Sequence, residues 1–169
     1  MIHRIQFEQW VPFAIEKVFL FFANPQNLPR IMPPGTATQL AAVRLVSPPP
    51  SKGVADIDQL AGTGSEIMTS FRPLPFFPMR TEWIALITEF EWNHHFADTQ
   101  KKGPFKRFQH RHEFSAELRD GTSGTIVRDL IQYDPGFGPL GDVAQMLFIA
   151  PGLKKTFEYR QKMLEKLLS

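Results

Sequence analysis

The chain has 169 residues, a formal net charge of +2 at pH 7 and no cysteine. Its length suits one domain with a sizeable core, and the lack of thiols excludes disulfides, thiolate nucleophiles and cysteine-type zinc sites. No apolar run approaches the ~18 residues that a membrane-spanning helix needs, and the first residues lack a signal-peptide pattern, so we expect residues 1–169 to form one cytoplasmic domain with no stable membrane insertion.

The N-terminal part of the chain predicts a strand followed by two short helices. Apolar and polar residues alternate over Ile2–Val11, as in a strand, and Pro12 ends the pattern. The period then changes to that of a helix, which ends at Asn24. Pro25 suits the first position of a second short helix that runs through Ile31.

The middle of the chain predicts antiparallel strands separated by proline-rich loops. Strands are expected at Thr38–Val46, Lys52–Leu60, Ser65–Phe71, Thr81–Phe90 and Trp92–Asp98. The loop Arg72–Met79 carries Phe76 and Phe77. Because exposed loops seldom hold so much apolar surface, we expect this loop to fold over another part of the molecule.

The segment Gly103–Gly141 predicts a β-hairpin with an unusual face. Two alternating strands flank a turn-rich stretch, Arg119–Gly124. Side chains alternate between the two faces of a strand, so every second residue shares a face. The residues of this face are Phe108, His110, His112 and Phe114 on the first strand, and Thr125, Val127, Asp129, Ile131 and Tyr133 on the second. Aromatic side chains mixed with two histidines and an aspartate predict the wall of a cavity.

The polar residues of this face admit three interpretations. Pairing of the two strands places Asp129 roughly opposite His112 or Phe114. We favour a buried hydrogen-bonded pair that holds the strands in register. A carboxylate beside an imidazole also suits a general base, which makes His112 and Asp129 the catalytic candidates, and the His-x-His spacing suits part of a metal site. Since no third histidine or clustered carboxylates accompany the pair, we expect no metal and no cofactor.

A further pair of histidines, His94 and His95, is adjacent in a predicted strand. Adjacent strand residues point to opposite faces, so we expect one imidazole to face solvent while the other could join the cavity.

A basic patch surrounds the turn before the hairpin. A solvated hairpin tip is the favoured interpretation, and transient contact with a membrane or a protein partner is the alternative. The patch lacks a groove-binding helix or a stacking motif, so no nucleic-acid binding is expected. Nucleotide-binding and serine-hydrolase motifs are also absent from the sequence. The patch consists of Lys101, Lys102, Lys106 and Arg107, with Arg111 nearby.

The C-terminal segment Leu140–Leu168 returns to a helical period with an apolar stripe. Ala150-Pro151-Gly152 predicts a kink or break within this helix. Strands grouped together, with the helices segregated from them, argue for an α+β fold in which the sheet wraps around the terminal helix.

Four motifs, taken in order, resemble those of a known superfamily. They are VPFAIEKVFLFFANPQNLPRIMPP (Val11–Pro34), GPFKRFQHRHEF (Gly103–Phe114), DLIQYDPGFGPLG (Asp129–Gly141) and FEYR (Phe157–Arg160). These motifs resemble the START-related helix-grip proteins, which include birch-pollen-allergen-like and polyketide cyclase-like members. The resemblance is closest to the bacterial ligand-binding, cell-division-inhibitor-like group.

The resemblance implies a helix-grip fold, in which a curved antiparallel sheet of about seven strands surrounds a long C-terminal helix, with two short helices after strand one. It also implies a deep cavity for a lipid, isoprenoid or polyketide-like molecule. We therefore expect a binding or transport protein, with a polyketide cyclase- or dehydratase-like enzyme that uses His112 and Asp129 as the alternative. The expected ligand contacts are Phe76, Phe77, Phe108, His110, His112, Phe114, Val127, Asp129, Ile131, Tyr133 and Phe157. The oligomeric state is left open.

Overall fold

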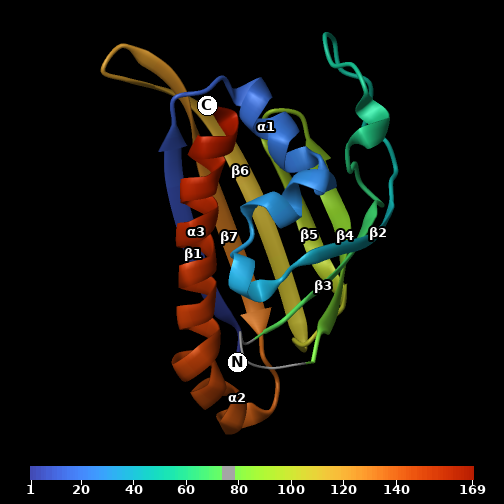
Figure 1. Ribbon diagram of the computed structural model, residues 1–169, viewed down its shortest axis with the longest axis vertical. Coiled ribbons are helices and arrows are strands. Elements are labelled where there is room, and N and C mark those ends of the chain that lie inside the picture. Colours follow the sequence, from blue (N-terminus) through green and yellow to red (C-terminus); the bar gives the residue numbers. More distant parts are fainter. Residues whose placement is uncertain (74–78) are drawn as a thin grey trace.

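A curved antiparallel sheet grips a long C-terminal helix in the computed structural model, which describes residues 1–73 and 79–169 (Figure 1). Within these ranges the sheet has seven strands in the order β1-β7-β6-β5-β4-β3-β2. The predicted α+β class and the count of about seven strands are therefore confirmed. The strands are β1 (His3–Val11), β2 (Gln39–Arg44), β3 (Glu66–Phe71), β4 (Thr81–Glu91), β5 (His95–Lys102), β6 (Arg107–Arg119) and β7 (Thr122–Asp134).

Helices cover one face of this sheet. Figure 1 shows the long helix α3 lying along β1 and β7, with α1 and the segment after it placed over the middle strands. None of the helices in residues 1–73 and 79–169 is long and apolar enough to cross a membrane. The helices are α1 (Ile15–Ala23), the 3₁₀ turns η1 (Pro25–Ile31), η2 (Pro34–Thr36) and η3 (Ile57–Gln59), then α2 (Gly138–Ala144), the π-helical η4 (Gln145–Ile149) and α3 (Ala150–Leu168).

The two predicted short helices after strand one correspond to α1 and η1. Asn24 separates them in an extended conformation, and its side-chain oxygen accepts a 3.0 Å hydrogen bond from the backbone N–H of Gln26. Pro25 occupies the first position of η1, where a missing N–H costs nothing. Asn24 therefore ends one helix and caps the next, which turns the chain across the sheet.

Phe19 anchors α1 to the sheet. Its side chain is fully buried and makes edge contacts with Phe90, Phe96 and Phe114, at ring-centroid distances between 5.1 and 5.9 Å. Burial of a side chain of this size contributes about 1.5–3 kcal/mol, and each aromatic contact adds about 0.5–1.5 kcal/mol. These three strand residues come from β4, β5 and β6, so one aromatic ring sets where α1 lies over the sheet.

The C-terminal helix is irregular just before the predicted break. The widened turn is η4, where the N–H of Ala150 donates to the carbonyl of Gln145, and the helix continues through Pro151 into α3. Proline has no N–H and its ring clashes with the carbonyl four residues earlier. A π turn placed directly before Pro151 relieves this clash without ending the helix.

Two sequence predictions in the middle of the chain are wrong. The segment Lys52–Leu60 is not a strand: it contains a turn and η3, and Asp56 adopts a left-handed conformation that a strand does not allow. The strand predicted at Trp92–Asp98 begins only at His95, because Trp92 to His94 form the turn between β4 and β5. The expectation that Phe76 and Phe77 fold over the molecule concerns residues outside the described ranges.

The histidines at this turn meet the expectation only in part: the side chain of His94 faces solvent and is 69% exposed, but His95 does not lie on the cavity face of the sheet. His94 is part of the turn rather than of a strand, so the alternation of faces does not apply to it. The Nδ1 atoms of His94 and His95 lie 3.1 Å apart, side by side. His95 pairs with Glu113 across β5 and β6, on the face that the helices do not cover.

Candidate functional site

A cavity of about 140 Å³ lies between the sheet and the α1–η1 segment. Strands β3 to β6 provide its floor, and α1 with η1 provides its roof. Only Arg160 reaches it from α3. The floor residues are Ile67, Ile87, Phe96, Asp98, His110 and His112, and the roof includes Phe21, Phe22, Leu28 and Ile31. Most of the lining is apolar. The two imidazoles and the charged groups come from β5, β6 and α3, and the roof adds the amides of Asn24 and Asn27.

Asp129 on β7 contacts both of the histidines that line the cavity from β6. It lies directly opposite His112 in the register of β6 and β7, as the sequence predicts to within one pair. Its Oδ1 atom accepts a 2.9 Å hydrogen bond from Nε2 of His110 and lies 2.7 Å from Nδ1 of His112. All three side chains are buried. One carboxylate oxygen therefore contacts both imidazoles of the His-x-His motif.

Burial disfavours the charged form of each of these three side chains. It lowers the pKa of His110 and of His112, and the carboxylate of Asp129 offsets this effect only in part. Burial alone would raise the pKa of Asp129, but the two imidazoles outweigh it and hold the pKa of that carboxyl below its ordinary value. At neutral pH the cluster is therefore an ionised Asp129 between two neutral imidazoles.

The hydrogen bonds assign different roles to the two imidazoles. A neutral imidazole carries one N–H, so His110 donates through Nε2 and keeps Nδ1 as an acceptor. Nδ1 of His112 is close to Asp129 but poorly aligned, and it has no hydrogen-bond partner among the described residues. With its proton assigned to Nδ1 by this proximity, His112 keeps Nε2 as a free acceptor.

Asp98 and Arg160 complete the polar groups around the cavity. Oδ2 of Asp98 lies 3.8 Å from Nδ1 of His110, and burial raises the pKa of Asp98. The guanidinium of Arg160 lies over the ring of Phe157, 4.7 Å from its centroid, at the edge of the cavity. A cation, a carboxyl group and two neutral imidazoles can orient a ligand that carries oxygen atoms.

Nine of the predicted ligand contacts lie in the described residues, and they fall into three sets. His110 and His112 line the cavity, whereas Asp129 and Val127 border a pocket of only about 10 Å³, the size of one water molecule. The others belong to the apolar core or pack against it, and Tyr133 accepts a 3.4 Å hydrogen bond from Gln145. These core residues are Phe108, Phe114, Ile131, Tyr133 and Phe157. Phe76 and Phe77 lie outside the described ranges. As ligand contacts, all of these residues remain predictions.

Sequence reasoning missed several cavity residues. Phe96 and Asp98 are two residues apart on β5 and pair with His112 and His110 of β6. The alternation of residues in this strand is a usable signal. If the strand is paired with the first strand of the hairpin, both side chains fall on the same face of the sheet as His110 and His112. Arg160 stands in the FEYR motif, but no pattern in the sequence shows which side of the helix faces a cavity.

Residues 11–151 match the model of a protein family described as polyketide cyclase / dehydrase and lipid transport. The chain belongs to this family. Comparison with curated protein sequences gives no significant match. The predicted resemblance to the START-related helix-grip superfamily is confirmed, and the family and fold together support a hydrophobic ligand-binding fold.

Three solved structures share the fold over nearly the whole chain. The protein Ms6760 from Mycobacterium smegmatis is 14% identical, with a TM-score of 0.65 over 98% of this chain and 90% of that one. Ara h 8.0201 is 14% identical, with a TM-score of 0.63 over 99% and 98%. A point mutant of norcoclaurine synthase from Thalictrum flavum, in complex with a transition-state analogue, is 13% identical, with a TM-score of 0.60 over 100% and 98%. At these identities the likeness shows the fold alone.

Proposed function

We propose that the protein binds a small hydrophobic molecule of the lipid, isoprenoid or polyketide-like class in the cavity beneath η1. The observation that carries the proposal is the lining of this cavity, which is largely apolar with a few polar side chains among the apolar ones. Small-molecule sites have this composition because apolar walls provide affinity and a few polar groups fix orientation. Arg160, His112 and Asp98 suit a ligand with an oxygen-bearing end.

The volume of the cavity limits what part of a ligand it holds. At about 140 Å³ it is close to the roughly 150 Å³ apolar cavity that holds benzene. Typical ligand sites measure roughly 300–1,000 Å³. The cavity therefore accepts about one ring or a short chain, and a larger ligand requires displacement of roof side chains such as Phe22 and Leu28.

Fluorescence titration with 8-anilinonaphthalene-1-sulfonate tests the proposal, because this probe is aromatic with one anionic group. We expect saturable binding, weakened by Ile67→Phe, which fills the cavity from its floor. Leu118→Phe is the matched control: it adds the same ring at a side chain that is 70% exposed, on another part of the sheet. Equal affinity in the two variants would show that the probe binds elsewhere. Native mass spectrometry of the purified protein would then identify a co-purifying ligand.

The alternative function is a polyketide cyclase- or dehydratase-like enzyme. A specific observation favours it: His112 lines the cavity, is neutral, keeps Nε2 as an acceptor and has Asp129 behind Nδ1. This arrangement suits a general base, with the carboxylate stabilising the imidazolium that forms when a proton is taken from a substrate. His112→Asn keeps an amide near the position of Nδ1 and removes Nε2. Unchanged turnover of an aromatic polyketide substrate by this variant would exclude the mechanism.

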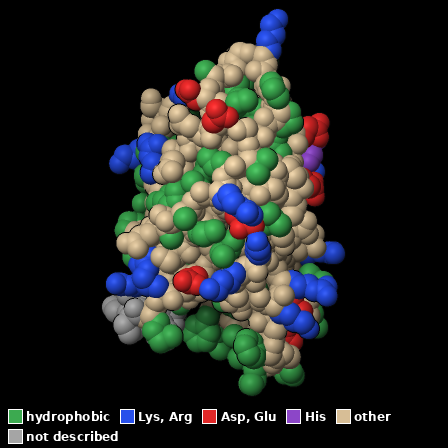
Figure 2. Space-filling model, turned by 90° about the vertical axis from the view of Figure 1, so that its right-hand side faces the viewer, with side chains coloured by type: hydrophobic (Ala, Val, Ile, Leu, Met, Phe, Trp, Pro, Cys, Tyr) green, Lys and Arg blue, Asp and Glu red, His purple; other side chains and the backbone are tan. Residues whose placement is uncertain are grey.

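Contact with an anionic membrane through the α2–η4 segment is a further part of the proposal. This segment exposes large apolar side chains, and Figure 2 shows hydrophobic side chains gathered at the lower end of the molecule with basic ones nearby. Lys106 and Arg107 are exposed beside it, whereas Lys101 and Lys102 of the same patch form ion pairs with glutamates. The exposed apolar residues are Phe137, Leu140, Val143, Met146, Leu147 and Phe148.

Co-sedimentation with vesicles tests this contact. We expect binding to vesicles of phosphatidylglycerol and phosphatidylcholine but not to phosphatidylcholine alone, because basic groups favour anionic lipid. Leu140→Asp should abolish it, since the side chain is 78% exposed in the apolar segment. Leu118→Asp is an equally polar change at a side chain that is 70% exposed elsewhere. Equal losses in both variants would contradict a docking role for the α2–η4 segment.

A further inference from the structure

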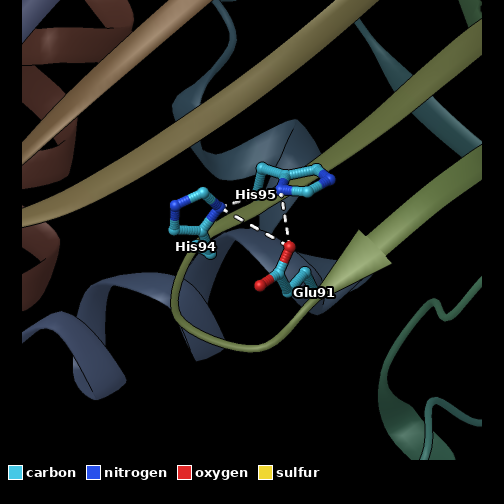
Figure 3. Close-up of side chains that lie close together, drawn as sticks. All are labelled: Glu91, His94 and His95. Atoms are coloured by element: carbon cyan, nitrogen blue, oxygen red, sulfur yellow. Dashed lines mark hydrogen bonds and ion pairs between the residues drawn. The ribbon is translucent and has the colours of Figure 1, made fainter.

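A second group of imidazoles and carboxylates lies away from the cavity, at the turn between β4 and β5 (Figure 3). Glu91 is the last residue of β4, His94 lies in the turn and His95 is the first residue of β5. Figure 3 shows the carboxylate of Glu91 directed toward the two imidazoles. These residues are not among those that line the proposed ligand cavity.

The conformation of the turn brings the three side chains together. Asn93 adopts a left-handed conformation with φ of 57°, which asparagine tolerates better than most residues. The backbone N–H of His94 donates a 3.2 Å hydrogen bond to the carbonyl of Glu91. His95 is the strand partner of Glu91 in the register of β4 and β5. Both histidines are therefore held beside the same carboxylate by backbone geometry.

The distances between the side-chain donor atoms match those around a tetrahedral metal ion. The Nδ1 atoms of His94 and His95 are 3.1 Å apart, and they lie 3.7 and 3.4 Å from Oε2 of Glu91. Zinc binds imidazole nitrogen and carboxylate oxygen at about 2.0–2.2 Å, which places neighbouring donors of a tetrahedron about 3.4 Å apart. We propose that Glu91, His94 and His95 bind a divalent transition-metal ion of the zinc type.

The neighbours of His95 provide the outer contacts that such a site needs. Nε2 of His95 lies 3.4 Å from Oε2 of Glu89. A metal-bound imidazole commonly donates its other N–H to a carboxylate, which fixes the ring and increases its basicity. Glu89 is itself bound by Arg111, which also bonds Glu113 at 3.0 Å. The group has three carboxylates, from Glu89, Glu91 and Glu113, and a single guanidinium, from Arg111. Its net charge is therefore negative, which favours binding of a cation.

Exposure of the side chains gives the ion an entry path. Those of Glu91 and His94 are 63% and 69% exposed, whereas that of His95 is only 13% exposed. His95 is thus a fixed ligand, and the other two reach the ion from the solvent side. Water can occupy the fourth position of the tetrahedron. Two imidazoles and one carboxylate suit zinc, copper or nickel rather than magnesium or calcium, which prefer oxygen ligands.

The buried group of Asp98, His110 and His112 is a competing location for a metal ion, since its donor atoms also lie within 4.8 Å of one another. Its surroundings are less suitable, because Arg160 borders the same cavity and its positive charge opposes the binding of a cation there. The experiment must therefore show which of the two groups takes up the ion.

Isothermal titration of the full chain with Zn²⁺ tests the proposal. We expect one site in the wild type, weakened by Glu89→Gln by about 10–100-fold, as is typical for loss of an outer-shell partner. His94→Ala removes a direct ligand and should cost at least as much. The matched control is His3→Ala, because His3 also lies beside a carboxylate, at 3.3 Å from Asp142, but far from the turn. Its affinity should equal that of the wild type.

Binding of Co²⁺ gives a second readout, because a tetrahedral site produces visible absorption bands that an octahedral aquo ion lacks. We expect these bands in the wild type and in His3→Ala, and their loss in His94→Ala. An unchanged thermal unfolding curve with chelator present would show that the variant is folded, as expected for an exposed side chain. Failure of the wild type to bind Zn²⁺, or equal affinity in His94→Ala and His3→Ala, would overturn the proposal.

Discussion

Removal of the Asp129 carboxylate tests whether the buried cluster holds β6 and β7 together. Asp129 is 6% exposed and contacts Nε2 of His110 at 2.9 Å and Nδ1 of His112 at 2.7 Å. Asp129→Ala removes the acceptor of the His110 hydrogen bond and leaves Nε2 of His110 unsatisfied in a buried space. Both imidazoles are neutral at pH 7, and an unsatisfied buried polar group costs about 1–3 kcal/mol. We therefore expect a loss of about 1–3 kcal/mol in the free energy of unfolding.

The matched control is the neighbouring residue on the opposite face of β7. Arg128 donates a 2.6 Å hydrogen bond to Glu8, and the two side chains are 38% and 43% exposed. Exposed ion pairs contribute about 0–1 kcal/mol, so Arg128→Ala should change stability by no more than that.

Urea denaturation at pH 7, followed by far-ultraviolet circular dichroism, gives the free energy of unfolding for both variants from the midpoint and the slope. A loss for Asp129→Ala no larger than that for Arg128→Ala would refute the structural role of the carboxylate. A reduced slope of the denaturation curve would instead show that the variant has lost compactness. Midpoints would then be compared only between proteins whose slopes agree.

Three other predictions concern the same fold. Because burial lowers the pKa of His110 and His112 below 6.5, the unfolded chain binds more protons than the folded one as the pH falls below that value. Denaturation should therefore show the protein less stable at pH 5.5 than at pH 7.5, by up to about 1 kcal/mol for each histidine; equal stability at the two pH values would contradict this. Phe157→Ala removes a ring that is 3% exposed and should cost about 3–5 kcal/mol, whereas Phe148→Ala, at 63% exposure, should stay within about 0.5 kcal/mol. Gly141→Ala would drive a Cβ atom into the backbone of the loop before α2, so its melting temperature should fall, and an unchanged value would mean that this loop moves freely.

The features that the sequence predicted correctly are those encoded by local periodicity. Alternation over β6 and β7 placed His110, His112 and Asp129 on one face, and the short turn between the strands fixed their pairing to within one residue. Pro25 and Asn24 marked the junction of α1 and η1 because their backbone chemistry suits those positions whatever the tertiary context.

The location of the cavity depends on contacts that no local pattern encodes. The roof lies over β5 and β6 because Phe19 packs against rings from three strands, and these contacts span 70 or more positions of the sequence. The cavity was predicted between the sheet and the long helix, but its roof over the sheet is formed by α1 and η1, with Arg160 from α3. The turn at His94 differs from the predicted strand for a simpler reason: Asn93 is a usual turn residue, and its left-handed conformation lies between the end of β4 at Glu91 and the start of β5 at His95.

The structural and functional roles of the buried cluster are compatible because they use different atoms. His110 uses Nε2 to bind Asp129 and keeps Nδ1 on the side of Asp98, whereas His112 turns Nδ1 to Asp129 and keeps Nε2 as an acceptor. Each imidazole thus engages the sheet with one nitrogen and leaves the other available. The carboxylate that stabilises the pairing of β6 and β7 therefore also sets the tautomer of His112. A ligand that bonds to Nε2 of His112 would meet an acceptor whose orientation is already fixed, so ordering it would cost little entropy on binding.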